Sequence, residues 1–230
     1  MTTPAPEGQT RPPIAILIPL PVLVATVSLL TLTATLVSFG AGLFAPLAPQ
    51  LPADPVAAAA AFSESPVAVG ARLTARATFV FFIAAYLARP LWERFRWQPA
   101  AWALRNRRWL GFAAALSHSV HLAYVVAAQY AGNDPLDVVT LLGGGLGFLL
   151  FWLMGITSND TAVRRLGNGW GWLHRTGMHY LWFIFILTYA GAAAQNPMLA
   201  VFVVLLAGGA LLRLANHRWP VSATATDSNA

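Results

Sequence analysis

The chain has 230 residues, of which 57% are hydrophobic and only 10% are charged. This composition is typical of an integral membrane protein and excludes an ordinary soluble domain. Cysteine is absent, which excludes disulfides, iron–sulfur clusters and thiolate zinc sites. The net charge of +6 comes from arginine alone, since there is no lysine. The arginines lie between apolar segments, so they indicate orientation in a membrane rather than nucleic-acid binding.

Apolar stretches follow one another along the chain, each near the ~20 residues that a membrane-spanning helix needs. They lie at about 14–39, 67–88, 108–130, 136–156, 170–194 and 197–214. We therefore expect an all-α, polytopic six-helix transmembrane bundle over residues 14–219. The first stretch is too long for a signal-peptide core and lacks a clear cleavage site, so we expect a retained helix. Residues 1–13 and 220–230 are rich in Pro, Thr, Ser and Ala and are expected to be mobile cytoplasmic tails.

The arginines mark one side of the expected bundle. The connection between the second and third helices, the connection between the fourth and fifth, and the end of the sixth carry Arg89, Arg94, Arg96, Arg105, Arg107, Arg108, Arg164, Arg165, Arg213 and Arg218. The opposite loops, 40–66, 131–135 and 195–196, contain no arginine. Because cytoplasmic loops carry the arginine excess, we expect both termini to be cytoplasmic.

The glycines at positions 143, 144, 145 and 147 give no sign of a nucleotide-binding domain. They follow no strand and lie in an apolar helix, whereas a dinucleotide fingerprint joins a strand to a helix N-terminus. Close packing between helices through small residues is the better interpretation. Flavin or nicotinamide chemistry would then belong to a partner.

Four of the five histidines lie inside the expected membrane helices. His118 and His121 are in the third helix, and His174 and His179 are in the fifth. Ionisable residues in a membrane span are costly and are functional candidates by default. Histidines that face each other from two helices are what a bis-imidazole haem site requires.

Depth along the two helices favours a meeting of these histidines. The third and fifth helices both begin on the cytoplasmic side and run parallel. At 1.5 Å per residue, His118 lies roughly 15 Å beyond Arg108, and His179 lies roughly 14 Å beyond Trp170. These two imidazoles are therefore expected at similar depths.

Haem is favoured over the alternatives by the surroundings of the histidines. Aromatic side chains suited to a porphyrin occur on the same helices, namely Phe112, Tyr124, Tyr180, Trp182 and Phe183. The alternatives are structural histidines that bond across helices, and a metal held without haem. A direct metal site usually recruits carboxylates or thiolates, and a proton pump needs a carboxylate in the membrane. No Asp or Glu lies in the core of any expected helix.

Arg72 and Arg76 lie four residues apart on one face of the second helix, near its outer end. Arg72 can extend to the outer headgroups. Arg76 lies about 13 Å into the helix, and that helix offers no acidic partner. A haem propionate would supply the anion that a guanidinium binds best. The alternative is an arginine bonded to the carbonyls of a broken helix.

Two stretches resemble a known family. The first is Arg107-Arg108-Trp109-Leu110-Gly111, followed ten residues later by His121; the second combines Thr157-Ser158, Arg164-Arg165-Leu166-Gly167 and Trp172-Leu173-His174-Arg175. Over roughly residues 67–215 the chain resembles the ferric-reductase-like transmembrane family. Within that family it is most similar to the haem-binding membrane subunits of bacterial methionine-sulfoxide reductase systems.

The resemblance implies a six-helix cytochrome with haem b, one group or a pair, in the bacterial inner (plasma) membrane. His121 corresponds to the outer ligand of the third helix and His174 to the inner ligand of the fifth. The family's remaining histidines would fall at Leu187 and near Arg107, where this sequence departs from the pattern. His118 and His179 are candidate replacements.

The leading hypothesis is a membrane b-type haem protein that carries electrons from a quinone or flavin-type donor to an acceptor at the outer face. It would be the electron-transfer subunit of an oxidoreductase, with a protein redox partner or a larger membrane complex. The alternative is a membrane anchor or assembly subunit in which haem is incidental or absent.

Overall fold

The computed structural model describes residues 65–132, 138 and 141–218, together with 21–23, 25–27, 29–30, 54, 56–57 and 61. Over these residues the chain is all-helical and contains no strand, which confirms the predicted class. Four described helices are long and apolar enough to cross a membrane. A fifth span results if Leu141–Ile156 and Asp160–Leu166, which meet at a bend of 105°, are joined.

The first predicted span, 14–39, lies mostly outside the described residues, although the positions described between 21 and 30 are helical. The predicted count of six spans therefore stays a prediction. The tails predicted at 1–13 and 220–230 lie wholly outside the described residues.

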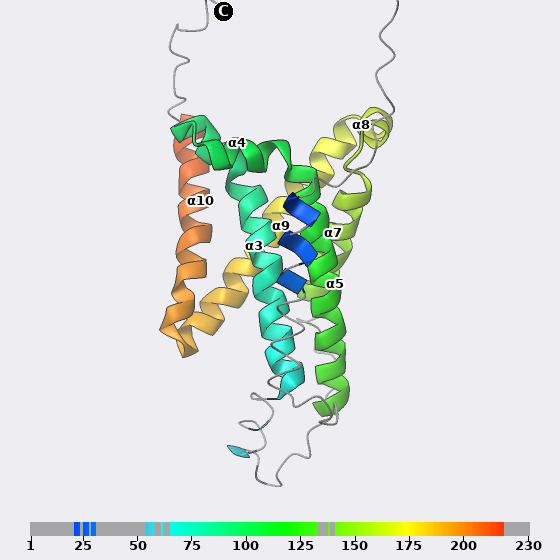
Figure 1. Cartoon of the computed structure of the whole chain (residues 1–230), viewed down its shortest axis with the longest axis vertical. Coiled ribbons are helices and arrows are strands. Elements are labelled where there is room, and N and C mark those ends of the chain that lie inside the picture. Colours follow the sequence, from blue (N-terminus) through cyan, green and yellow to red (C-terminus); the bar gives the residue numbers. More distant parts are fainter. Residues whose placement is uncertain are drawn as a thin grey trace, which may run out of the picture.

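Helices α3 (Pro66–Phe95) and α5 (Arg107–Gly132) form the centre of the bundle, and the short helix α4 (Gln98–Arg105) connects them across one end (Figure 1). Ser65 begins α3 by accepting a hydrogen bond from the Ala68 N–H, and Pro66 occupies the first turn, where a missing N–H costs nothing. Helix α3 ends at Arg96, which adopts a left-handed conformation with φ of 52°. This turn directs the chain into α4.

The interface between α3 and α5 consists of small and hydroxyl side chains. Ala114, Ala115 and Ser117 of α5 are buried, and the Thr78 Oγ1 of α3 donates a hydrogen bond to the Ser117 Oγ at 3.1 Å. Gly70 lies directly under the Tyr124 ring, where a Cβ atom would collide with it. Small residues let helix backbones approach closely, and this is how membrane helices gain packing energy.

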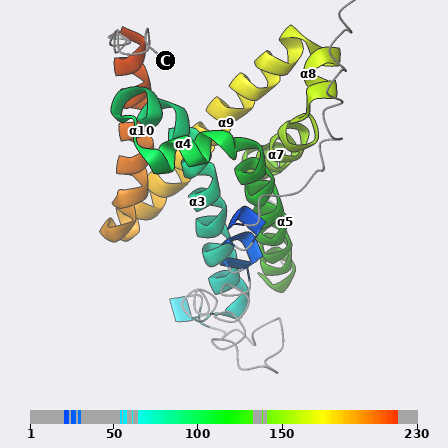
Figure 2. The same cartoon turned by 45° about the horizontal axis from the view of Figure 1, so that its top comes forward.

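The second half of the chain folds back over this pair. It comprises the π-helical turn η1 (Leu141–Gly145), α7 (Leu146–Ile156), α8 (Asp160–Leu166), α9 (Asn168–Gln195), the 3₁₀ turn η2 (Pro197–Leu199) and α10 (Ala200–Arg218). Helix α9 begins beside α8 and runs obliquely across the bundle to the far end of α10 (Figure 2). It packs mainly against α7 and α10.

Helix α10 packs against α3 next to a proline and bonds to carbonyl groups there. Pro90 lies inside α3 and has no N–H to donate to the Tyr86 carbonyl four residues earlier. The Arg213 Nη2 donates to this carbonyl at 2.8 Å, and its guanidinium lies 4.0 Å from the centre of the Tyr86 ring. The Asn216 Nδ2 donates to the Pro90 carbonyl at 3.0 Å. The carbonyl freed by Pro90 thus explains why α10 carries an arginine in its apolar stretch.

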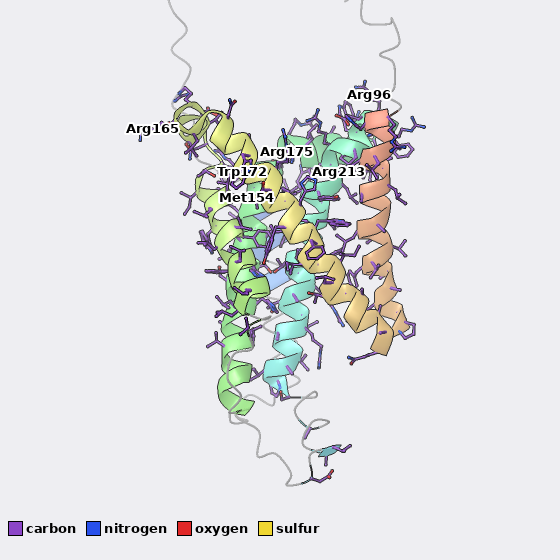
Figure 3. All side chains as sticks on the ribbon, turned by 180° about the vertical axis from the view of Figure 1, so that it is seen from behind. Arg96, Met154, Arg165, Trp172, Arg175 and Arg213 are labelled. Atoms are coloured by element: carbon purple, nitrogen blue, oxygen red, sulfur yellow. The ribbon has the colours of Figure 1, made fainter. Side chains whose placement is uncertain are left out.

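Most described arginines lie at the end of the bundle that carries α4 and α8. Figure 3 shows Arg96, Arg165, Arg175 and Arg213 in that half of the molecule. Arg72 and Arg76 lie in the opposite half of α3. The structure therefore has one arginine-rich end, as the sequence predicts, while the side of the membrane that it faces stays a prediction.

Candidate functional site: two histidine-lined cavities

The bundle contains two cavities of about 530 and 420 Å³, within the range of roughly 300–1,000 Å³ that small-molecule and cofactor sites occupy. We call the larger one, lined by α8 and the start of α5, the inner cavity, because the sequence predicts that its end faces the cytoplasm. We call the smaller one the outer cavity. Phe151 of α7 is the one described residue that lines both, so its ring stands between them.

The outer cavity takes its histidines from α5. The His121 Nδ1 lies 2.9 Å from the Ala71 carbonyl oxygen and 3.3 Å from the Thr74 Oγ1. A carbonyl can only accept, so Nδ1 carries the hydrogen and the lone pair is on Nε2. Metal-bound histidines typically have one ring nitrogen fixed by a backbone carbonyl in this way. The His121 Nε2 therefore remains available to a ligand.

His118 lies on the same wall of the outer cavity. Its ring centre is 5.4 Å from that of His121 and 5.3 Å from that of Phe151. Gly144 of the π-helical turn lines the same cavity. Both imidazoles of this cavity thus come from one helix.

The inner cavity takes its histidines from α9. The His174 Nε2 lies 3.2 Å from the Thr157 Oγ1, whose own hydrogen is donated to the Leu153 carbonyl at 2.6 Å. The imidazole is therefore the donor of this bond. Trp170 stacks on the His174 ring with centres 4.2 Å apart, and its indole N–H donates to the Thr157 carbonyl at 2.8 Å.

His179 also lines the inner cavity, although its side chain is largely exposed in the described structure. The His179 Nδ1 lies 2.7 Å from the Arg175 carbonyl oxygen one turn earlier. By the same reasoning as for His121, its Nε2 keeps the free lone pair. His179 is therefore a second imidazole with one nitrogen fixed and the other available.

Charge distinguishes the two cavities. The inner cavity is lined by Arg89, Arg107, Arg108, Arg175 and Arg213, with Asp160 as its one acidic lining residue among those described. The outer cavity is lined by Arg72 and Arg76 and by no described acidic residue. Both cavities are therefore suited to ligands that combine an apolar body with negative charge.

The four membrane histidines are divided between the cavities. Sequence depth suggested that His118 and His179 meet, whereas these two side chains line different cavities. His217 lines neither. In the part of the chain that the structure describes, no group of three or more His, Cys, Asp or Glu side chains could hold a metal ion directly.

The two positions at which the sequence departs from the family pattern lie in these same cavities. Leu187 lines the outer cavity with His121, and Arg107 lines the inner cavity with His174. His118 and His179 are on the same helix as the histidine that each would accompany. They therefore do not supply an imidazole from the opposite wall.

Sequence reasoning missed the aromatic lining of the cavities. The cavity walls contain Phe82, Phe151, Trp170, Phe185 and Tyr189, and none of the residues expected there, namely Phe112, Tyr124, Tyr180, Trp182 and Phe183. The i, i+4, i+8 spacing of Leu181, Phe185 and Tyr189 is the signal that could have found one wall.

The glycine run has two roles. Gly143 and Gly147 pack opposite Ile184 and Leu181 of α9, and both also line the outer cavity. The prediction of close helix packing is therefore consistent with the structure. A π-helical turn inside an α-helical span, as at Gly143, is frequent at functional sites.

Comparison with known proteins gives one distant match. No protein-family model matches the chain, and no solved structure matches it. The protein-methionine-sulfoxide reductase heme-binding subunit MsrQ of Enterobacter sp. (strain 638) is 28% identical over 142 residues, which cover 55% of this chain and 70% of that protein. This match agrees with the resemblance seen in the two sequence motifs. The chain is a distant relative of the MsrQ family.

Proposed function

We propose that this chain is a multi-pass bacterial membrane protein that binds haem b and carries electrons through the bilayer. The observation that carries the proposal is the pair of cavities on either side of Phe151, each with imidazoles and arginines. The name of the related Enterobacter protein, a heme-binding subunit of a reductase, supports the same assignment. Haem, when bound, supplies the one-electron redox chemistry.

Both cavities offer an imidazole and apolar walls for haem, and the outer cavity also offers cations for its propionates. His121 and His179 each offer a free Nε2 on a ring fixed by a backbone carbonyl. Aromatic and aliphatic side chains form the walls, and Arg72 and Arg76 provide cations for propionates in the outer cavity. His118 and His174 are the alternative candidate ligands of their cavities, each on the same wall as the first. One haem in each cavity is the arrangement these residues favour.

Electrons would enter from a quinone or flavin-type donor and leave to an acceptor at the outer face. The described residues include no nucleotide-binding domain, so the donor and acceptor chemistry would belong to a protein redox partner or a larger membrane complex. With the arginine-rich end in the cytoplasm, the inner cavity would receive electrons first.

A membrane anchor or assembly subunit is the second candidate function. One observation favours it: neither cavity has histidines on two facing walls, so no bis-imidazole site exists without movement of a helix. In that case haem would be incidental or absent.

An absorption spectrum of the purified full chain separates the two functions. We expect a dithionite-reduced spectrum of the b-cytochrome type, altered or lost when His118, His121, His174 and His179 are replaced singly by Ala, for variants drawn from both α5 and α9. His217→Ala is the matched control and should keep the wild-type spectrum. A colourless wild-type preparation would support the anchor instead, and four single variants with wild-type haem content would refute these ligands.

A further inference from the structure

The wall of the outer cavity that faces the histidines contains an unsatisfied polar group. Tyr189 of α9 is only 6% exposed and lines this cavity. Its hydroxyl has no hydrogen-bond partner among the described residues. Buried hydroxyl groups nearly always have a hydrogen-bond partner, because an unpaired one loses its hydrogen bonds to water and gains none in the protein. An acceptor is therefore missing at this position.

The Tyr189 ring cannot easily turn its hydroxyl elsewhere. Phe202 of α10 stacks on it with ring centres 4.4 Å apart, and Phe79 of α3 meets it edge-on at 5.1 Å. Phe185, one turn earlier on α9, stacks at 6.3 Å. Aromatic contacts from three helices fix the ring, so the direction of the O–H group is a property of the fold.

A cation lines the same cavity as this hydroxyl. Arg76 of α3 and Tyr189 of α9 both line the outer cavity. No described carboxylate is within ion-pair distance of Arg76. The cavity thus presents a guanidinium and a phenol together, two donors without an acceptor. A neutral carbonyl ligand would satisfy the hydroxyl and leave the guanidinium charge uncompensated, so an anionic acceptor is favoured.

We propose that Tyr189 and Arg76 together bind one carboxylate group in the outer cavity, and that this group is a propionate of the haem. The inference rests on the proposed haem function and extends it to a residue, Tyr189, that the sequence did not indicate. Arg76 supplies the charge, and Tyr189 supplies a directed hydrogen bond. Tyr189 is a positioning residue, because it would set the orientation of the porphyrin rather than bind its iron.

Tyr180 provides a matched control on the same helix. Its hydroxyl donates to the Leu142 carbonyl at 2.7 Å and is therefore already satisfied. It does not line the outer cavity. Replacement of either tyrosine by Phe removes one hydroxyl and keeps the ring, so only the Tyr189 change should affect a bound carboxylate.

The test compares haem with haem dimethyl ester, in which both carboxylates are masked. The full chain, produced in haem-depleted cells and purified in detergent, is titrated with each compound and followed by absorbance. We expect Tyr189→Phe to weaken haem binding roughly tenfold to a hundredfold, as loss of a hydrogen bond to a charged group does. Arg76→Leu should weaken it at least as much, and Arg76→Lys should restore part of the loss. Tyr180→Phe should bind haem like the wild type.

The ester decides what the pair binds. If the propionate is the partner, the wild-type chain binds the ester more weakly than haem, and Tyr189→Phe and Arg76→Leu bind the ester like the wild type. Equal binding of haem and ester by the wild type would overturn the propionate. If a free carboxylate such as benzoate then raised the melting temperature of the wild type but not of Tyr189→Phe, the pair would belong to that anion instead. A wild-type chain that binds neither compound would refute the haem function, and the propionate with it.

Discussion

The two cavities are built from similar parts on opposite walls. The inner cavity takes its imidazoles from α9 and the outer cavity from α5. The hydrogen bonds of the imidazoles also differ: His121 bonds to a backbone carbonyl of α3, whereas His174 bonds to the Thr157 side chain. Each of these helices therefore supplies its histidines to a single cavity, although both helices line the two cavities with other residues, and Phe151 stands between the cavities.

The difference in charge between the cavities follows from their depth. Arginines near the end of a membrane helix can extend toward water, so several of them line the inner cavity at little cost. Arginines deeper in a span need partners. Arg213 finds one in the carbonyl that Pro90 frees, and Arg76 is expected to find one in a ligand. The outer cavity thus depends more on its occupant than the inner cavity does.

The largest expected effect is on the activity of fused reporter enzymes, which shows which cavity faces the cytoplasm. A reporter enzyme that works only outside the cytoplasm should be active when fused near Pro52 and inactive when fused after Arg96 or Ala230, because arginine-rich segments stay inside. Activity is compared at matched expression levels. The reverse pattern would place the inner cavity at the outer face and invert the proposed direction of electron flow.

Removal of both histidines from one helix should empty one cavity. In His118→Ala/His121→Ala the outer cavity loses every imidazole, and in His174→Ala/His179→Ala the inner cavity does. Each double variant should keep a haem signal from the other cavity, measured as haem per chain and as separate potentials in a redox titration. Complete loss of haem in both double variants would instead indicate one shared site between α5 and α9.

The sequence predicted the all-helical class, and the histidines and arginines that it singled out line the two cavities, because both depend on local properties. Apolar runs of helical length identify spans, and histidines within such runs are conspicuous. The predicted meeting of His118 and His179 assumed straight, parallel helices. The bend of 105° after α7 and the oblique course of α9 divide the histidines instead. These features depend on contacts distant in sequence, such as Gly177 of α9 against Met154 of α7.

The hydroxyl of Tyr189 was missed for the same reason. Tyrosine in an apolar helix is unremarkable in sequence, and its missing partner becomes evident only when Phe79, Phe185 and Phe202 fix the ring. By contrast, Arg76 could be identified from sequence because a charge deep in a span needs an anion wherever it points.

A smaller effect, on protein stability, should follow from a larger side chain at the contact between α3 and α5 beside the outer cavity. Gly70 lies under the Tyr124 ring, one residue before the carbonyl that holds His121. Gly70→Val should push α3 and α5 apart and destabilise the protein by about 1–3 kcal/mol, as overpacking does. Thermal unfolding in detergent measures this change. Gly191→Val is the control, since a Cβ there meets no described atom within 4 Å; equal melting temperatures for the two variants would contradict the close contact.

The smallest expected effect tests the difference in histidine anchoring. In Thr157→Val the His174 Nε2–H loses its acceptor and keeps only the stacking with Trp170. In Thr74→Val, His121 keeps its hydrogen bond to the Ala71 carbonyl at 2.9 Å. A single hydrogen bond of this kind contributes about 0.5–1.5 kcal/mol. Thr157→Val should therefore weaken haem binding in the inner cavity by a few-fold, and Thr74→Val should change the outer cavity less.

Each threonine variant is measured in a chain whose other cavity has lost both histidines, so that the signal comes from haem in one cavity. Thr157→Val is placed in the His118→Ala/His121→Ala chain and Thr74→Val in the His174→Ala/His179→Ala chain, and haem loss to an excess of apomyoglobin gives the dissociation rate. A faster rate for Thr157→Val alone is the expected result, since valine keeps the shape of threonine and removes only the hydroxyl. An equal increase in the rate of haem dissociation from both cavities would mean that Thr74, rather than the Ala71 carbonyl, is the main hydrogen-bond partner of His121. The anchoring of the two histidines would then be alike, and the cavities would differ only in charge and in the helix that supplies their imidazoles.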